Sequence, residues 1–177
     1  MRALAAAAVA MPLIAGVWAL GLRAQVPPLP AGDQLGMEAG ESWDTYRGRA
    51  TASLSDAPAD QPVFALVTFS PALDPVAASA ALDEVRRVDA VVFRGAPPRA
   101  LPEPTAGQSR AAVFATAAQR AGVDELIDGV VVHESGARLR VLAGAQPVAA
   151  VEALPPDAVW GAFGIAPIRR TGAAAGV

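Results

Sequence analysis

The chain has no cysteine, no lysine and no asparagine, and it has only one histidine and one tyrosine among 177 residues. Without cysteine it can form neither a disulfide nor a thiolate metal site, and it cannot carry a lipoprotein's lipid. A single histidine without thiolates also argues against a zinc site. We therefore expect no metal and no cofactor, and a domain that is stabilised by packing alone.

Positive charge is sparse and dispersed along the chain. The 14 basic residues are all arginine, and 17 acidic residues outnumber them, so the net charge is −3. Nucleic-acid-binding proteins usually carry a basic stripe, and those that bind single strands stack bases on aromatic side chains. Aromatic residues make up only 5% of this chain. The composition predicts that nucleic acid is not a partner.

Charge is missing altogether from one long segment near the N-terminus. Residues 3–22 form an apolar run without a charged side chain, flanked by Arg2 and Arg23. A helix of about 20 residues spans the roughly 30 Å hydrocarbon core of a bilayer. We therefore predict a transmembrane anchor over residues 1–23, with residues 3–22 in contact with membrane lipid.

The same segment has features of a secretory signal peptide, so a second interpretation stays open. Its start is short and basic, and Val17–Ala19 and Leu22–Ala24 both offer a small residue at a cleavage position. An anchor makes the chain a single-pass protein of the cell membrane with its C-terminal domain outside the cytoplasm. A cleaved signal makes it a secreted domain, and a buried soluble helix is the third alternative.

Two further segments precede the main domain. Residues 24–40 are proline-rich and are predicted to form a linker. Residues 41–57 are predicted to form a juxtamembrane helix that begins after a capping Ser42. Its apolar side chains recur at spacings of three and four residues: Trp43, Tyr46, Ala50 and Leu54. This helix either docks on a partner or the lipid surface, or packs on its own domain.

Residues 60–168 are predicted to form an α+β domain, followed by a disordered tail over residues 169–177. The expected strands are residues 63–69, 88–94, 129–133 and 147–154, and the expected helices are residues 74–85, 109–121 and 135–143. Two strand–helix–strand units interleave in the ferredoxin-like βαββαβ sandwich. The first and third strands are the most apolar, as central strands are. Helix 109–121 is then an insertion that could cover the open face of the sheet.

The arrangement of residues 62–155 resembles the propeptide-like inhibitors of subtilisin-type proteases. The resemblance rests on the final helix and strand, Ser135–Leu154. Domains of that family are ferredoxin-like, and their last strand and tail can occupy a protease cleft. The resemblance implies a membrane-tethered inhibitor or chaperone of an exported protease. The helix at residues 109–121 departs from the family pattern, in which the second and third strands are joined directly.

No catalytic constellation is evident in the sequence. His133, Glu134 and Ser135 are consecutive at a strand end, where neighbouring side chains point to alternate faces. Gly107–Ala111 contains a Gly-x-Ser sequence, but a proline-rich loop precedes it instead of the strand that a nucleophile elbow requires. Ser109 is better interpreted as a helix cap. We predict that the chain is not an enzyme, with a small-ligand-binding domain or a hydrolase as the remaining alternative.

The strongest candidates for partner contact follow the last predicted strand. Trp160, Phe163 and Ile165 form an apolar segment that is either an exposed contact patch or an arm folded back on the core. Trp43 and Tyr46 are the second candidates. The sequence therefore predicts a non-catalytic, membrane-associated protein-interaction module whose protein partner is unidentified.

Overall fold

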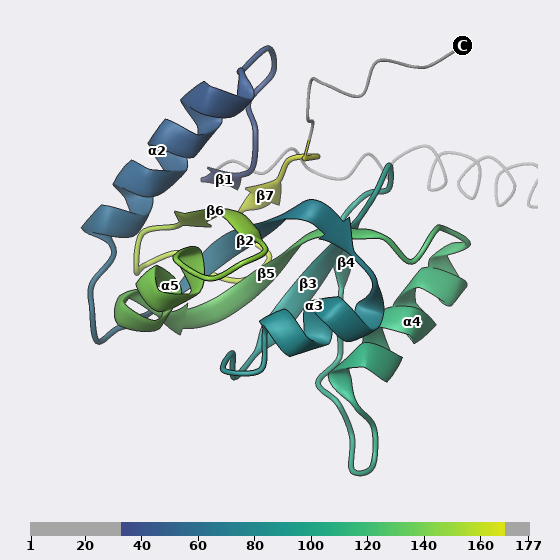
Figure 1. Cartoon of the computed structure of the whole chain (residues 1–177). Coiled ribbons are helices and arrows are strands. Elements are labelled where there is room, and N and C mark those ends of the chain that lie inside the picture. The colour runs from purple at the N-terminus through teal and green to yellow at the C-terminus, as the bar shows by residue number, and fades with distance from the viewer. Residues whose placement is uncertain (1–32, 169–177) are drawn as a thin grey trace, which may run out of the picture. The chain divides into compact units, whose positions relative to one another are not determined.

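A five-stranded antiparallel sheet with the strand order β4-β3-β5-β2-β6 forms the centre of an α+β domain (Figure 1). The computed structural model describes residues 33–168, which belong to one compact unit. The strands are β2 Pro62–Leu73, β3 Val88–Phe93, β4 Arg99–Ala100, β5 Ile127–Ser135 and β6 Val148–Ala153. The two most apolar strands, β2 and β5, lie side by side within the sheet, as the sequence predicts.

The sequence of β2 explains its central position. Successive side chains of a strand point to opposite faces, so an apolar residue at almost every position requires cover on both sides. Val63, Ala65 and Val67 belong to the core on one face, whereas Leu66 belongs to the core on the other. Apolar cover on both faces therefore holds β2 in the middle of the domain.

The helices are α2 Trp43–Asp56, α3 Pro75–Ala81, α4 Arg110–Ala121 and α5 Gly136–Ala143. Their starts follow local capping chemistry, because a side-chain oxygen satisfies a free N–H group of the first turn. The Ser42 hydroxyl accepts a hydrogen bond from the N–H of Thr45, and the Ser109 hydroxyl accepts one from the N–H of Ala112, so both serines cap their helices as the sequence predicts. Asp74 caps α3, which ends four residues earlier than expected. Gly122 ends α4 in the left-handed conformation with φ +65°.

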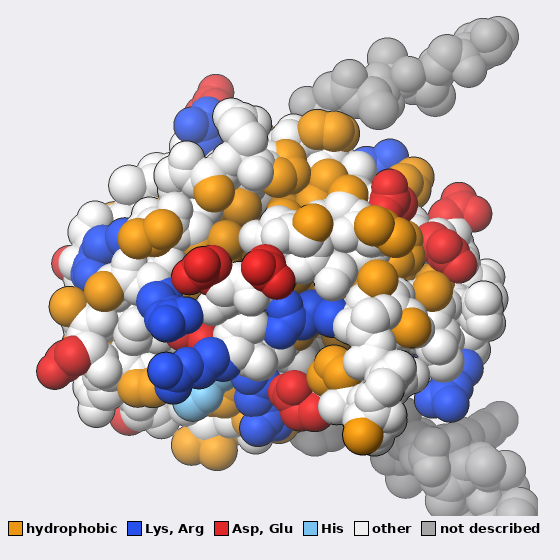
Figure 2. All heavy atoms as spheres, turned by 60° about the horizontal axis from the view of Figure 1, so that its bottom comes forward, with side chains coloured by type: hydrophobic (Ala, Val, Ile, Leu, Met, Phe, Trp, Pro, Cys, Tyr) orange, Lys and Arg blue, Asp and Glu red, His pale blue; other side chains and the backbone are white. Residues whose placement is uncertain are grey.

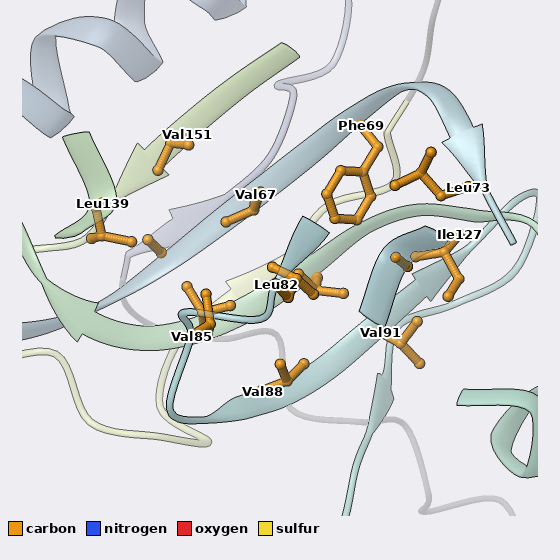
Figure 3. Packing of buried hydrophobic residues seen from close by; sticks show 14 of the residues in the cluster. Val67, Phe69, Leu73, Leu82, Val85, Val88, Val91, Ile127, Leu139 and Val151 are labelled. Carbon is orange, nitrogen blue, oxygen red and sulfur yellow. The ribbon is translucent and has the colours of Figure 1, made fainter. Parts of the chain in front are cut away.

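Three helices, α3, α4 and α5, cover one face of the sheet, which we call the helical face (Figure 1). Figure 3 shows aliphatic and aromatic side chains from strands and helices meeting in this layer. The largest fully buried members are Phe69, Phe93, Phe114, Leu82, Ile127 and Leu139. This layer is the main hydrophobic core.

The inserted helix α4 lies on the helical face and not on the open face of the sheet, where the sequence placed it. Its apolar stripe explains the difference, because Phe114 and Ala118 are completely buried in the same cluster as Leu82 of the α3 end. Arg110 at the start of α4 also donates hydrogen bonds to the carbonyls of Leu82 and Val85. The insertion therefore widens the helical layer.

Segments from the two ends of the described chain cover the opposite face. β1, Gln34–Leu35, pairs in parallel with β7, Gly164–Ile165. The N–H of Ala166 donates to the carbonyl of Leu35 at 2.7 Å, and Leu35 is completely buried. The start of the domain therefore falls inside residues 24–40, which the sequence assigned to a linker. The segment after Pro155 is an arm folded back on the core.

Helix α2 packs on its own domain along the edge strand β6. Tyr46 and Ala50 are buried in a small cluster with Ala150, whereas Leu54 joins the core of the helical face. The hydroxyl of Ser53 accepts a hydrogen bond from the N–H of Ala153 at 3.0 Å, which satisfies one outward backbone group of the edge. Of the two interpretations of this helix, packing on its own domain is the one observed.

The predicted transmembrane segment, residues 3–22, and the predicted tail, residues 169–177, lie outside the described residues. Among residues 33–168, none of the helices has both the length and the apolar character needed to span a bilayer.

Candidate functional site

Four aromatic side chains meet on the opposite face, and we call them the aromatic patch: Phe64, His133, Trp160 and Phe163. The imidazole of His133 stacks on Phe64 with ring centroids 4.4 Å apart and an interplanar angle of 24°. Trp160 and Phe163 lie 5.7 and 5.2 Å from the same phenyl ring. Phe64 is therefore the hub that joins the sheet to the C-terminal arm.

The patch is assembled by sheet register and by a turn in the arm. Phe64 of β2 and His133 of β5 are direct partners across the antiparallel pair, which brings their side chains to one face. The arm turns twice, and the N–H of Ala162 donates to the carbonyl of Val159 at 3.0 Å. Gly161 within this turn has φ +86°, a conformation that side chains other than glycine rarely adopt. The pairing of β7 with β1 then fixes the end of the arm.

Exposure is uneven across this region. Trp160 keeps 39% of its surface accessible and the neighbouring Val159 keeps 64%. Phe163 and Ile165 are half-buried against the core of the opposite face. The turn at residues 159–161 thus presents apolar side chains to solvent while its base is anchored.

The predicted contact residues divide into two groups. Trp160, Phe163 and Ile165 come together on the opposite face, as members of or neighbours to the aromatic patch. Trp43 and Tyr46 belong to a different cluster between α2 and β6, where their rings are 5.4 Å apart. Tyr46 is completely buried, so it has no accessible surface to offer a partner and serves packing.

A buried polar network lies beside that second cluster. Glu152 of β6 is almost inaccessible, and it accepts hydrogen bonds from the guanidinium of Arg49 and from the N–H of Gly36, the latter at 2.6 Å. Arg49 also donates to Glu41 at 2.9 Å and to the carbonyl of Gly36 at 2.8 Å. One arginine therefore ties α2, the segment after β1 and the edge strand together.

Gly36 is suited to this junction for two reasons. Its φ is +97°, in the region that favours glycine, and a Cβ there would approach the carbonyl oxygen of Ala166 to 2.8 Å. Any other residue would strain the backbone and collide with the arm. The glycine thus allows the chain to turn while its N–H reaches Glu152.

Titration of the network follows from burial and charge. Burial raises the pKa of Glu152, and the N–H of Gly36 and the Arg49 guanidinium oppose that rise. The hydrogen bonds of Arg49 lower the pKa of Glu41. Burial, reinforced by the charge of Glu152, raises the pKa of Tyr46. The Tyr46 hydroxyl is therefore neutral at physiological pH.

The residues considered for catalysis are not gathered into a reactive group. His133 stacks on Phe64 on the opposite face, whereas the Ser109 hydroxyl caps α4 on the other side of the sheet. Glu134 lies on the helical side, where it accepts a hydrogen bond from the N–H of Arg86 at 2.8 Å. Figure 2 shows arginine and acidic side chains interspersed over one face of the molecule instead of being segregated by sign.

Three important residues of these sites escaped sequence reasoning. Phe64 lies inside a continuous apolar run and is indistinguishable there from a core residue. Arg49 and Glu152 are 103 positions apart, so their pairing has no local signal. The one available sign was an acidic residue inside the otherwise apolar strand 147–154, because a buried carboxylate requires a partner.

Comparison with known proteins adds no relationship. No protein-family model matches the chain, and neither the curated proteins nor the solved structures give a significant match.

Proposed function

We propose that this chain is a non-catalytic, membrane-anchored protein whose α+β domain binds another protein through the aromatic patch and the Val159–Gly161 turn. The observation that carries the proposal is Trp160, which stays 39% exposed although it is packed on Phe64 and Phe163. Interface hot spots are enriched in tryptophan, and they bind best when the free protein already holds the side chain in place. Trp160 meets both conditions.

The proposed fold is the ferredoxin-like βαββαβ sandwich. The support is the strand order β6-β2-β5-β3, in which the first and third strands of the motif are central and every neighbour is antiparallel. Strand β4 and helix α4 are then additions between the second and third strands. Helix α2 and the β1–β7 pair are additions that come from the two ends of the described chain.

The proposed location is the cell membrane, with the domain outside the cytoplasm. The support is the uncharged run of residues 3–22, which has the length and composition of a membrane-spanning helix. A secreted domain released by signal cleavage is the alternative. The two are distinguished by whether the mature protein keeps its N-terminal residues, which N-terminal sequencing of the natural protein determines.

The geometry does not favour the protease-inhibitor interpretation. That interpretation needs a tail after the last strand that is free to enter a cleft. Here Leu154 is buried, Phe163 packs on Phe64, and Gly164 donates a hydrogen bond to the carbonyl of Asp33 at 3.0 Å. Through residue 168 the arm is occupied by its own domain.

The test is site-specific photocrosslinking of the full-length protein in its native membrane. A photoreactive amino acid replaces Val159, which is 64% exposed beside Trp160, and a second probe replaces Val141, which is 77% exposed on α5. We expect a discrete protein adduct from the Val159 position only. Trp160→Ala in the same probe protein should abolish that adduct.

Two outcomes would overturn the proposal. One is the absence of any adduct from Val159 above the level given by the Val141 probe. The other is an adduct that survives Trp160→Ala, because the patch would then not be the contact. A positive result is completed by purifying the captured protein and measuring its affinity for the wild-type and variant proteins.

A further inference from the structure

A pocket of about 300 Å³ lies between α4 and the chain around β4, away from the aromatic patch. Its lining includes Arg99, Leu101, Pro102, Gln108, Thr116 and Arg120. Its size is at the lower end of the range for small-molecule sites, about 300–1,000 Å³. The pocket therefore has room for a small organic molecule.

Two arginines with unused hydrogen-bonding capacity line this pocket. Six of the ten arginines in residues 33–168 donate from their side chains to a carboxylate or a backbone carbonyl. The four whose guanidinium groups make no such bond within this part of the chain are Arg47, Arg86, Arg99 and Arg120. Two of these four arginines, Arg99 and Arg120, line one pocket.

The rest of the lining favours a negatively charged guest. None of its residues is acidic, and Gln108 and Thr116 add neutral hydrogen-bonding groups. Glu103, the acidic residue of the neighbouring loop, lies 3.6 Å from the guanidinium of Arg87 and so faces a different cation. Arginine presents a planar fork of donors that matches carboxylate and phosphate oxygens. No acidic side chain of the lining thus neutralises the positive charge of the two arginines.

The two arginines are carried by elements whose backbones are fixed. Arg99 pairs with Val91 in the β3–β4 ladder. Arg120 lies in the last turn of α4, which is anchored by the completely buried Phe114 and Ala118. The separation between the two Cα positions is therefore set by the fold. Ligand binding then needs to order only the two arginine side chains.

We propose that this pocket binds a small organic anion, with a carboxylate or phosphate group held between Arg99 and Arg120. The apolar part of the guest lies against Leu101, Pro102 and Val113. This site is independent of the protein-contact function proposed above, because no residue of the aromatic patch lines it.

Isothermal titration calorimetry of the full-length protein in a non-ionic detergent tests the site. The probes are phenyl phosphate and benzoate, with benzyl alcohol as the uncharged analogue and inorganic phosphate as the group without an apolar body. We expect saturable binding of at least one aromatic anion, and at least about tenfold weaker binding of benzyl alcohol. Binding of phenyl phosphate alone identifies phosphate as the recognised group, and binding of benzoate alone identifies carboxylate.

Arg99→Gln/Arg120→Gln is the test variant, and Arg47→Gln is the matched control. Arg47 is an exposed arginine on α2 whose guanidinium likewise makes no hydrogen bond to a carboxylate or carbonyl among residues 33–168. The double variant should bind at least about tenfold more weakly, because each lost guanidinium removes charge-assisted hydrogen bonds. The control should bind like the wild type. The proposal fails if no probe binds saturably, if benzyl alcohol binds as well as the anions, or if Arg47→Gln weakens binding as much as the double variant.

Discussion

The two faces of the sheet are covered by different means. On the helical face, three helices bury a layer that is almost entirely aliphatic and aromatic. On the opposite face, two short strands, a folded arm and the start of α2 cover a smaller apolar cluster, a stack of aromatic rings and an ion pair with a buried carboxylate. The helical face is held by apolar burial, whereas the opposite face also depends on specific polar pairing.

The difference shows how one small sheet can combine stability with an accessible surface. Burial of apolar surface contributes about 25 cal/mol per Å² and does not depend on the exact orientation of each group. A large apolar core therefore tolerates substitutions at its periphery. The cover on the opposite face comes from segments near the two ends of the described residues, and it buries less apolar surface. Hydrogen bonds and an ion pair therefore have to hold it in place. The exposed Trp160 lies on the cover, where a side chain can remain accessible without opening the main core.

The largest effect should come from truncating the helical core. Phe114→Ala removes a completely buried ring from the junction of α3 and α4, and we expect the free energy of unfolding to fall by about 3–5 kcal/mol. Denaturant unfolding followed by circular dichroism measures it. Val141→Ser, at a side chain 77% exposed, is the control and should change stability by less than about 0.5 kcal/mol. A loss below about 1 kcal/mol for Phe114→Ala would show that α4 is not part of the core.

A smaller loss is expected from the ion pair under the cover. Arg49→Ala removes the guanidinium partner of the buried Glu152 carboxylate, which keeps the bond from the Gly36 N–H. We expect a loss of about 2 kcal/mol, below the full value for a buried pair because Arg49 is partly exposed. Arg49→Met/Glu152→Leu should recover most of that loss, since an apolar pair of similar volume needs no compensation. Both are measured by urea unfolding at pH 7. If the double variant is less stable than Arg49→Ala, the polar network stabilises the folded state more than its apolar replacement does.

The third prediction concerns the pH dependence of the same carboxyl group. The pKa of Glu152 is raised above its ordinary value of 4.5, so the folded state holds that proton more tightly than the unfolded state. Stability from this group is present below pH 4.5 and is lost as the pH rises through the raised pKa, by about 1.4 kcal/mol for each unit of the rise.

Comparison with Glu152→Gln isolates this contribution from that of Glu41, whose lowered pKa acts in the opposite direction. The stability of the wild type relative to the variant should decline between pH 4.5 and neutrality. Unfolding curves at several pH values measure the difference. A relative stability that increases with pH would mean that Arg49 outweighs burial at this site.

The smallest stability effect is expected at the centre of the proposed contact. Trp160→Ala removes a side chain that is 39% exposed, and we expect a loss of at most about 1 kcal/mol. Thermal unfolding of the variant, read beside the crosslinking of Val159, separates folding from binding. A loss as large as that of Phe114→Ala would make Trp160 a core residue, and the contact assignment would lose its basis.

The elements that local chemistry determines were predictable from sequence, and those that depend on distant partners were not. The apolar run of β2, the caps Ser42 and Ser109 and the terminal Gly122 of α4 each carry a signal within a few residues. Strands β1, β4 and β7 have two residues each, too few to show a period. Their existence follows from pairing that only the folded chain reveals.

The candidate site shows the same division. The segment containing Trp160 and Phe163 stood out because large aromatic residues cluster after the last strand. Phe64 did not stand out, because its special role comes from register with His133 and not from its own surroundings in the sequence. The side on which α4 packs was misjudged for a similar reason, since an apolar stripe defines a buried face but not the neighbour that buries it.

The parallel pairing of β1 and β7 has a mechanical consequence. The two strands run in the same direction, so tension applied between Asp33 and Ala166 pulls them lengthwise past each other. The hydrogen bonds that join them, from Gly164 to Asp33 and from Ala166 to Leu35, then resist together instead of breaking one after another. Gly36 follows β1 directly, and its bonds to Glu152 and to Arg49 resist the same displacement. Tension on either strand must therefore break these hydrogen bonds before it is transmitted to the five-stranded sheet.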